Sequence, residues 1–360
     1  MVLNKHPENK SGILYKRKIK VFHGLVNYGT QAGLFARELR KSGIKAISAA
    51  FPDPFQRVID ITLLHGGNYF QKILRHSWNS LFLITCFFKY NTFHFYYGTT
   101  LTRAHWDLPF YKLFRKKIVF HYLGNDVQLY KDSTGENDIT NMVGFLNKRD
   151  VAEYNNVIKK RLKYESKYSD LQIVCGPNLS EFVPGSIVLP LAIDLNEFKY
   201  SPMAERKQEF VIMHAPTDRA SKGTSIILET IDQLIRDGFN IKKVLVENVP
   251  HKDLQERYKE CDIFIDQILS GWYGTAAIEA MASGRAVVCF LRDEYYQYIN
   301  YKDDIPIINS TPGSLYNVIK NLINNRDRLP EIALKSREFV EKIHDVKKIS
   351  NVLISYYGDI

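Results

Sequence analysis

Short apolar runs that are rich in β-branched residues alternate along the chain with segments of helical spacing. The clearest series lies between residues 210 and 291, where the runs VIM, KVLV, DIFI and AVVCF are separated by segments with apolar residues every three or four positions. Strands that are almost wholly apolar are typical of a parallel sheet covered by helices on both faces. This part of the chain is therefore predicted to be an α/β domain.

The first half of the chain repeats this pattern. The run IKVFHGL (19–25) predicts a first strand, a helix with Phe35 and Leu39 on one face follows, and KAISAAF predicts the next strand. Further strands are predicted at TFHFYYG, KKIVFHY, LQIVC and IVLPLAI. The apolar pattern is lost near residues 199–207, so we place the domain boundary there. The prediction is a first domain at 1–200, a second at 201–335 and a closing helix at 336–360.

Candidate ligand-binding residues follow the predicted strands of the second domain. Arg219, Lys222 and Gly223 come after its first strand, and a later loop ends at Gly274 before a helix predicted to begin at Thr275. Ligands bind at the carboxyl ends of parallel strands. A helix start offers unpaired N–H groups and a positive dipole end, which suit a phosphate, and the two side-chain cations add to this potential.

Glu279 lies about one turn into the same predicted helix. Its carboxylate can accept hydrogen bonds from vicinal hydroxyls such as those of a ribose. Each residue has a plainer explanation by itself: the cations suit a solvated loop, Glu279 a helix surface, and the small residues of AMASG close packing of the helix, which Gly284 would end. Their order and spacing together favour a site for a nucleoside diphosphate and its sugar.

The stretch from 210 to 291 resembles the donor domain of the retaining glycosyltransferases of family 4, the group 1 transferases, which have the GT-B fold. Arg219 and Lys222 before Gly223 match the residues that bind the donor pyrophosphate, and Glu279 in EAMASGRAVV matches the glutamate that holds the ribose. VLPLAIDLNEF (188–198) resembles the segment that leads into that domain. The resemblance implies two Rossmann-like domains facing a cleft, with the last helix crossing back to the first domain.

The resemblance also implies an activity. A hexosyl or N-acetylhexosaminyl group would move from a UDP- or GDP-sugar to a hydroxyl of a glycan or lipid-linked acceptor, with retention, in the synthesis of a cell-surface polysaccharide or glycolipid. One departure stands out, because Gly271 lies where the family carries an earlier, sugar-contacting glutamate. We interpret this as a changed sugar contact. The alternatives are a non-catalytic nucleotide-binding partner protein and a nucleotide-sugar epimerase, although the latter class lacks the paired motifs.

The first domain offers two further candidate positions. Gly29 and Thr30 lie in the loop after the first strand and are predicted to lie near the acceptor or the donor phosphate. Asp126 and His121 accompany the strand at 116–122 and are the predicted catalytic pair. The family commonly has a His-Gly-x-Asp context here. In this chain Leu123 precedes the glycine, so His121 is expected to face differently from the family histidine.

Composition is that of an ordinary globular protein, with 45% hydrophobic and 24% charged residues among 360. Its four cysteines are scattered and indicate reduced thiols in the cytoplasm. The first twenty residues are polar and basic, so no signal peptide is expected. No Asp-x-Asp stands in a convincing metal-binding position, and two cations can replace a divalent ion. We therefore expect no cofactor and no metal.

Charge is concentrated in the first half. Residues 1–200 carry 28 Lys and Arg against 16 Asp and Glu, which gives +12, whereas the rest carry 21 against 23, which gives −2. No nucleic-acid motif accompanies this charge, so nucleic acid is not an expected partner. An anionic membrane surface is the other candidate. YFQKILRHSW (69–78) and FYKLFRKK (110–117) mix aromatic and basic residues as interfacial helices do; helices with aromatics facing the core fit equally.

Overall fold

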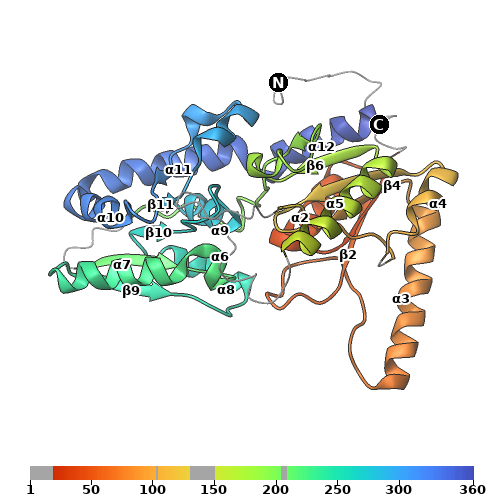
Figure 1. The fold of residues 1–360 in the computed structure, drawn as a ribbon, viewed down its shortest axis with the longest axis horizontal. Helices are drawn as coiled ribbons and strands as arrows, with labels where there is room; N and C mark the ends of the chain where they lie inside the picture. The colour runs from red at the N-terminus through yellow and green to blue at the C-terminus, as the bar shows by residue number, and fades with distance from the viewer. Residues whose placement is uncertain (1–18, 103, 130–150, 204–208) are drawn as a thin grey trace. The chain divides into compact units, whose positions relative to one another are not determined.

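The computed structural model describes residues 19–102, 104–129, 151–203 and 209–360. The chain forms two compact units (Figure 1). The first comprises Met1–Leu129, Asn156–Ala192 and Val346–Ile360, and the second comprises Tyr130–Asn155 and Ile193–Asp345. Each unit is built on its own parallel sheet, as the alternation of apolar runs and helical segments predicts.

The sheet of the first unit has seven strands in the order β3-β2-β1-β4-β5-β6-β7, and every neighbouring pair is parallel. The central strands are buried on both faces, which explains why their sequences read as continuous apolar runs. The strands are β1 (Lys20–Leu25), β2 (Lys45–Ala50), β3 (Ile61–Thr62), β4 (Thr92–Tyr96), β5 (Lys117–Tyr122), β6 (Leu171–Val174) and β7 (Ile187–Val188).

Helices cover this sheet. They are α2 (Gln31–Lys41), α3 (Tyr69–Lys89), α4 (Leu108–Leu113), α5 (Val151–Tyr168) and α12 (Val346–Asp359), with short 3-10 turns at Tyr28–Thr30 and Pro177–Leu179. The helix α2 packs against β1 and β2, and α12 packs against α2. The last helix of the chain therefore forms part of the first unit. Among the residues that the structure describes, we find no helix both long enough and apolar enough to span a membrane.

The sheet of the second unit has five strands in the order β12-β11-β10-β8-β9, all parallel. Its strands are β8 (Phe210–His214), β9 (Ile241–Leu245), β10 (Ile263–Ile265), β11 (Ala286–Cys289) and β12 (Ile308–Asn309). Its helices are α6 (Arg219–Lys222), α7 (Thr224–Arg236), α8 (His251–Tyr258), α9 (Thr275–Ala282), α10 (Leu315–Asn324) and α11 (Leu329–Ile343). The four strands predicted between residues 210 and 291 are all present.

The units divide at residues other than the predicted ranges. The first division falls between Ala192 and Ile193, and Ile193 forms a bridge with Asp345 at the far end of the second unit. The closing segment is two helices with a break after Ile343. Of these, α11 packs on α9 and β11 in the second unit, so only the residues from Val346 onward belong to the first.

Candidate functional site

The loop after β8 places Lys222 at the end of the short helix α6. Asp218 begins this helix by accepting a hydrogen bond from the Ser221 amide at 2.7 Å. Gly223 then joins α6 to α7 with a left-handed backbone (φ 73°), and a Cβ there would lie 2.7 Å from the Ile268 side chain. Only glycine fits between α6 and α7 without strain. Gly223 therefore fixes the backbone position of the preceding Lys222.

Lys222 and Gly274 meet at the carboxylate of Asp266. The Lys222 ammonium lies 2.6 Å from Oδ1, and the Gly274 amide donates to Oδ2 at 2.8 Å. Asp266 directly follows β10 and its side chain is 1% exposed. Gly274 is the N-cap of α9, which begins at Thr275 as predicted. The structure thus brings together three of the predicted residues, Lys222, Gly274 and Thr275, at the carboxyl end of the sheet.

Asp266 is a functional candidate that sequence reasoning missed, although a carboxylate directly after the apolar run DIFI is a visible signal. Its negative charge partly offsets that of Lys222, so the pair attracts an anion less strongly than a lone cation would. Asp266 also has a geometric role, because it holds the Lys222 ammonium beside the start of α9. The other N–H groups in the first turn of α9 have no hydrogen-bond partner within the helix. Together with the positive end of the helix dipole, they favour an anion at the start of α9.

Arg219 lies in a different environment from Lys222. Its guanidinium makes two hydrogen bonds to Glu247, at 2.7 and 2.5 Å, and its side chain is 60% exposed, compared with 13% for Lys222. This bidentate pairing holds the pKa of Glu247 below its ordinary value. Exposed ion pairs contribute little to stability, so exchanging Glu247 for a phosphate would cost Arg219 little.

Glu279 is buried one turn into α9 and is held from two sides. His251 Nε2 lies 2.7 Å from Oε1, and the Tyr258 hydroxyl donates to Oε2 at 3.0 Å. Burial raises the pKa of Tyr258 well above its ordinary value, so this hydroxyl keeps its proton. A carboxylate has about four lone-pair positions. Glu279 therefore keeps acceptor capacity after these two contacts, and His251 and Tyr258 are supporting residues that the sequence pattern did not reveal.

The backbone and the packing at position 271 do not accommodate a glutamate. The residue has a left-handed backbone (φ 76°), and an added Cβ would lie 2.6 Å from the Arg292 side chain. A longer side chain there would require both strain and displacement. The following Trp272 and Tyr273 are buried and stacked at 4.9 Å, and the Tyr273 hydroxyl lies 3.1 Å from His344 Nε2. The loop is therefore held by packing and a polar contact within the second unit.

In the first unit, Gly29 and Thr30 form the turn between β1 and α2. Both have left-handed backbones, with φ of 53° and 62°. The Gln31 side chain secures the turn by donating to the Gly29 carbonyl at 2.7 Å and to the Ala192 carbonyl at 2.9 Å. The turn thus lies at the carboxyl end of a central strand and directly before a helix, the position predicted for it.

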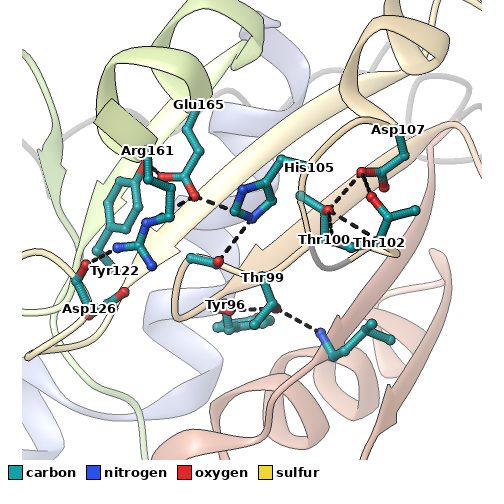
Figure 2. Close-up of polar contacts among 12 residues, drawn as sticks. Tyr96, Thr99, Thr100, Thr102, His105, Asp107, Tyr122, Asp126, Arg161 and Glu165 are labelled. Atoms are coloured by element: carbon teal, nitrogen blue, oxygen red, sulfur yellow. Dashed lines mark hydrogen bonds and ion pairs between the residues drawn. The ribbon is translucent and has the colours of Figure 1, made fainter. Parts of the chain in front are cut away.

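Asp126 belongs to a buried polar cluster that Figure 2 shows. Its carboxylate accepts hydrogen bonds from the amides of Leu123 at 3.1 Å and Gly124 at 2.8 Å, and its backbone carbonyl accepts one from Arg161. Burial raises the pKa of Asp126 to about 7 in spite of the opposing Arg161 charge. A carboxyl group in this state exchanges its proton near neutral pH, as a general acid or base requires.

Glu165 is a second carboxyl group in this cluster and was not anticipated. It accepts a hydrogen bond from Tyr122 at 2.9 Å, and its Oε1 lies 3.5 Å from Arg161 and 3.6 Å from His105. Figure 2 shows Arg161 between the carboxyl groups of Asp126 and Glu165. Burial raises the pKa of Glu165 to about 7 as well. Arg161 therefore pairs with the Glu165 carboxylate and donates a hydrogen bond to the Asp126 backbone carbonyl, beside two carboxyl groups whose pKa values are both near neutrality.

His121 lies apart from this cluster, in a fully buried group on the sheet. Its Nδ1 is 3.2 Å from His94 Nε2, and His94 Nδ1 is 2.5 Å from the Tyr357 hydroxyl of α12. His23 lies beside His94, with ring centroids 5.0 Å apart. We call His23, His94 and His121 the histidine group. Burial lowers the pKa of His121 to about 3, so it is neutral. Because His121 has no exposed surface, the structure favours a packing role for it over contact with a substrate.

Comparison with solved structures identifies the architecture. A sucrose-phosphate synthase from Thermosynechococcus elongatus superposes with a TM-score of 0.61 at 15% identity, covering 94% of this chain and 98% of the other. HepE from Anabaena, in complex with UDP, gives 0.61 at 14% identity, with coverage of 95% and 100%. A glycosyltransferase from Rickettsia africae ESF-5 gives 0.60 at 13% identity, with coverage of 95% and 98%. The fold is GT-B.

The GT-B prediction is thus confirmed at the level of fold, with its two Rossmann-like units of seven and five parallel strands. No family model matches the sequence, and no curated protein matches it. The low identities mean that the similarity lies in topology and not in shared residues.

Proposed function

We propose that this protein is a glycosyltransferase that moves a sugar from a nucleoside diphosphate sugar to an acceptor hydroxyl. The observation that carries the proposal is the convergence of Lys222 and the start of α9 on Asp266, with the buried Glu279 one turn further along the same helix. A diphosphate requires cations and helix N–H groups, and a ribose requires a fixed acceptor nearby. The GT-B fold and the UDP bound to HepE support a nucleotide donor.

In this proposal Lys222, Arg219 and the first turn of α9 stabilise the charge that develops on the departing diphosphate. Glu279 orients the ribose, with His251 and Tyr258 fixing its carboxylate. Asp126 exchanges a proton during the reaction, and Gly29 and Thr30 contact the acceptor or a donor phosphate. We further propose that the protein belongs to family 4 and transfers the sugar with retention of the anomeric configuration. The donor would be a UDP- or GDP-linked hexose or N-acetylhexosamine. The acceptor would be a glycan or a lipid-linked glycan in cell-surface polysaccharide or glycolipid synthesis, at the cytoplasmic face of the membrane.

The donor site is tested by nucleotide binding. UDP, GDP, ADP and dTDP are added to the wild type in a thermal-shift assay, and one of them is expected to raise the Tm. Lys222→Ala and Glu279→Gln should each weaken binding of that nucleotide about tenfold, which is the usual effect of removing one charge-assisted contact. Lys342→Ala is the matched control, because Lys342 is likewise paired with a carboxylate, that of Asp304 at 2.7 Å, on an exposed surface.

The three outcomes separate the possibilities. Selective stabilisation that is lost in both site variants and retained in Lys342→Ala supports the donor site and identifies the base. Stabilisation without acceptor-dependent sugar transfer by the purified protein would indicate a nucleotide-binding partner protein. No stabilisation by any of the four nucleotides would remove the donor site from the proposal.

A second prediction concerns metal ions. Since Lys222 and Arg219 are proposed to neutralise the leaving diphosphate, sugar transfer is expected to continue unchanged in the presence of excess EDTA. The measurement is the initial rate of nucleotide release with and without the chelator. Addition of Mg²⁺ or Mn²⁺ to chelator-treated protein is the control. A rate that falls to background with EDTA and returns with the metal would contradict the proposal.

A further inference from the structure

The helix α3 carries two apolar stripes on opposite sides. One packs against the core of the first unit through Phe82, Leu83, Cys86 and Phe87, with Asn79 buried on the same side. The other stripe is exposed. Its residues recur at intervals of three or four along the whole helix and are Phe70, Leu74, Trp78, Leu81, Ile84 and Phe88, all with more than half of their surface in contact with solvent.

This exposed stripe is not required by the fold. A helix that packs on a domain along one face normally carries polar residues on the other. Here Trp78 is 65% exposed and Phe70 is 70% exposed, although neither touches the core. Figure 1 shows α3 running beside the first unit's sheet near α4 and extending well past it toward its N-terminal end. The residues that pack on the core lie in its second half, whereas Arg75 and Asn79, nearer its start, bind the backbone of the loop at 64–66.

The exposed stripe continues onto α4. The rings of Phe88 and Phe114 are in edge contact, with centroids 6.0 Å apart, and Phe114 directly follows α4. Phe110 and Trp106 extend the surface with a second edge contact at 6.2 Å. Leu113 on the same short helix is 73% exposed. A continuous exposed apolar surface of this extent marks an interaction site.

The charge around this surface is mainly positive. Residues 61–102 and 104–125 contain seven Lys and Arg, at 72, 75, 89, 112, 115, 116 and 117, and one acidic residue, Asp107, which is buried. Asp170 lies nearby from another segment and pairs with Lys112 at 2.9 Å and Lys117 at 3.6 Å. Even with this carboxylate included, the surface keeps a strong positive excess.

We propose that the exposed stripe of α3, together with Phe110, Leu113 and Phe114, binds the surface of an anionic lipid bilayer. A helix of 21 residues is about 30 Å long, and its stripe runs parallel to its axis, so it would lie flat in the interface with aromatic and aliphatic side chains inserted. Surrounding cations would contact the anionic lipid headgroups and strengthen the binding. A second copy of this chain is a poorer occupant, because two positively charged surfaces would face each other.

The proposal is tested with the full-length protein and unilamellar vesicles. One set contains phosphatidylcholine alone, and the other contains phosphatidylcholine with phosphatidylglycerol. The protein is expected to float with the anionic vesicles, and raising the salt to about 1 M should weaken this binding by screening the charges. Leu74→Glu combined with Leu81→Glu should reduce partitioning by about tenfold or more, because charged side chains are unfavourable in the interface.

The matched control places the same substitutions at exposed apolar residues of the second unit, Ile235→Glu with Leu334→Glu, and should leave partitioning unchanged. Equal unfolding midpoints of the two double variants would show that both fold. Absence of wild-type binding to either vesicle type, or equal loss in both double variants, overturns the proposal. So does a wild-type dimer that Leu74→Glu with Leu81→Glu converts to monomer without any vesicle binding. The proposal does not depend on sugar transfer, and nucleotide binding in the same samples distinguishes the two failures.

Discussion

Asp126→Asn is expected to lower the rate of sugar transfer about 100-fold or more while the protein remains folded. The asparagine oxygen can still accept the amide hydrogen bonds of Leu123 and Gly124, so the turn after β5 is preserved. What is lost is a proton that exchanges near neutral pH, since the pKa of Asp126 is about 7. The measurement is kcat from nucleotide release between about pH 5 and pH 9, in which the wild type should titrate near 7 and the variant should not.

Asp107→Asn is the control for this experiment. Asp107 is also a buried aspartate of the first unit, and it accepts hydrogen bonds from Thr100 at 2.7 Å and from the Leu101 amide at 3.0 Å. Its substitution shows how much kcat falls when a buried carboxylate outside the proposed site is changed. Full turnover by Asp126→Asn with an unaltered pH profile would exclude Asp126 from the chemistry, and equal losses in both variants would assign the effect to folding.

Acid is expected to unfold the first unit through its histidine group. Burial lowers the pKa of His23 and His121 to about 3 and that of His94 well below its ordinary value, so all three are neutral in the folded state. The unfolded chain binds protons on them below about pH 6.5, whereas the folded chain does not. Stability therefore falls as pH drops from about 6.5 toward 3, by about 1.4 kcal/mol per pH unit for each histidine.

The two buried carboxyl groups act in the opposite direction. The pKa values of Asp126 and Glu165 are raised to about 7, so the folded state binds their protons more tightly than the unfolded state does. Their contribution is present at low pH and is lost as pH rises from about 4 through 7. They thus offset part of the histidine effect between these values, and the net slope depends on both sets.

Urea unfolding at several pH values between about 4 and 8 measures this balance. His121→Gln should flatten the loss of stability toward acid, because one buried neutral histidine is removed. Glu165→Gln should make that loss steeper, because one offsetting carboxyl is removed. Slopes that are the same in the wild type and both variants would contradict the assignment.

The sequence predicted those features that depend on local order. The alternating apolar runs located the strands of both sheets except the two-residue edge strands β3 and β12, and the glycine before Thr275 located the start of α9. It did not predict Asp266, because nothing in the spacing indicates that this carboxylate would face Lys222, 44 residues earlier. The pairing of Glu279 with His251 and the link from Asp126 to Arg161 escaped for the same reason. Contacts between distant segments depend on topology, which periodicity does not encode.

The breakdown of the closing segment into two helices also has a physical basis. One closing helix is predicted at 336–360, because apolar periodicity continues without a break as far as residue 357. The bridge from Ile193 to Asp345 and the hydrogen bond from the Ile193 amide to the His344 carbonyl at 2.9 Å interrupt it, because the backbone there pairs with another segment. The contact with Ile193 therefore outweighs the helix propensity of residues 344 and 345.

The placement of α12 in the first unit has a consequence for how the protein is made. Tyr357, close to the end of the chain, reaches His94 in the middle of the first sheet. During synthesis the strands of the first unit are made before the second unit, yet the helix that packs on α2 is translated only after Asp345, where the second unit ends. Apart from Tyr130–Asn155, which is translated earlier, the second unit is continuous from Ile193 to Asp345 and can finish its core first. The unit that is translated first is therefore the one completed last.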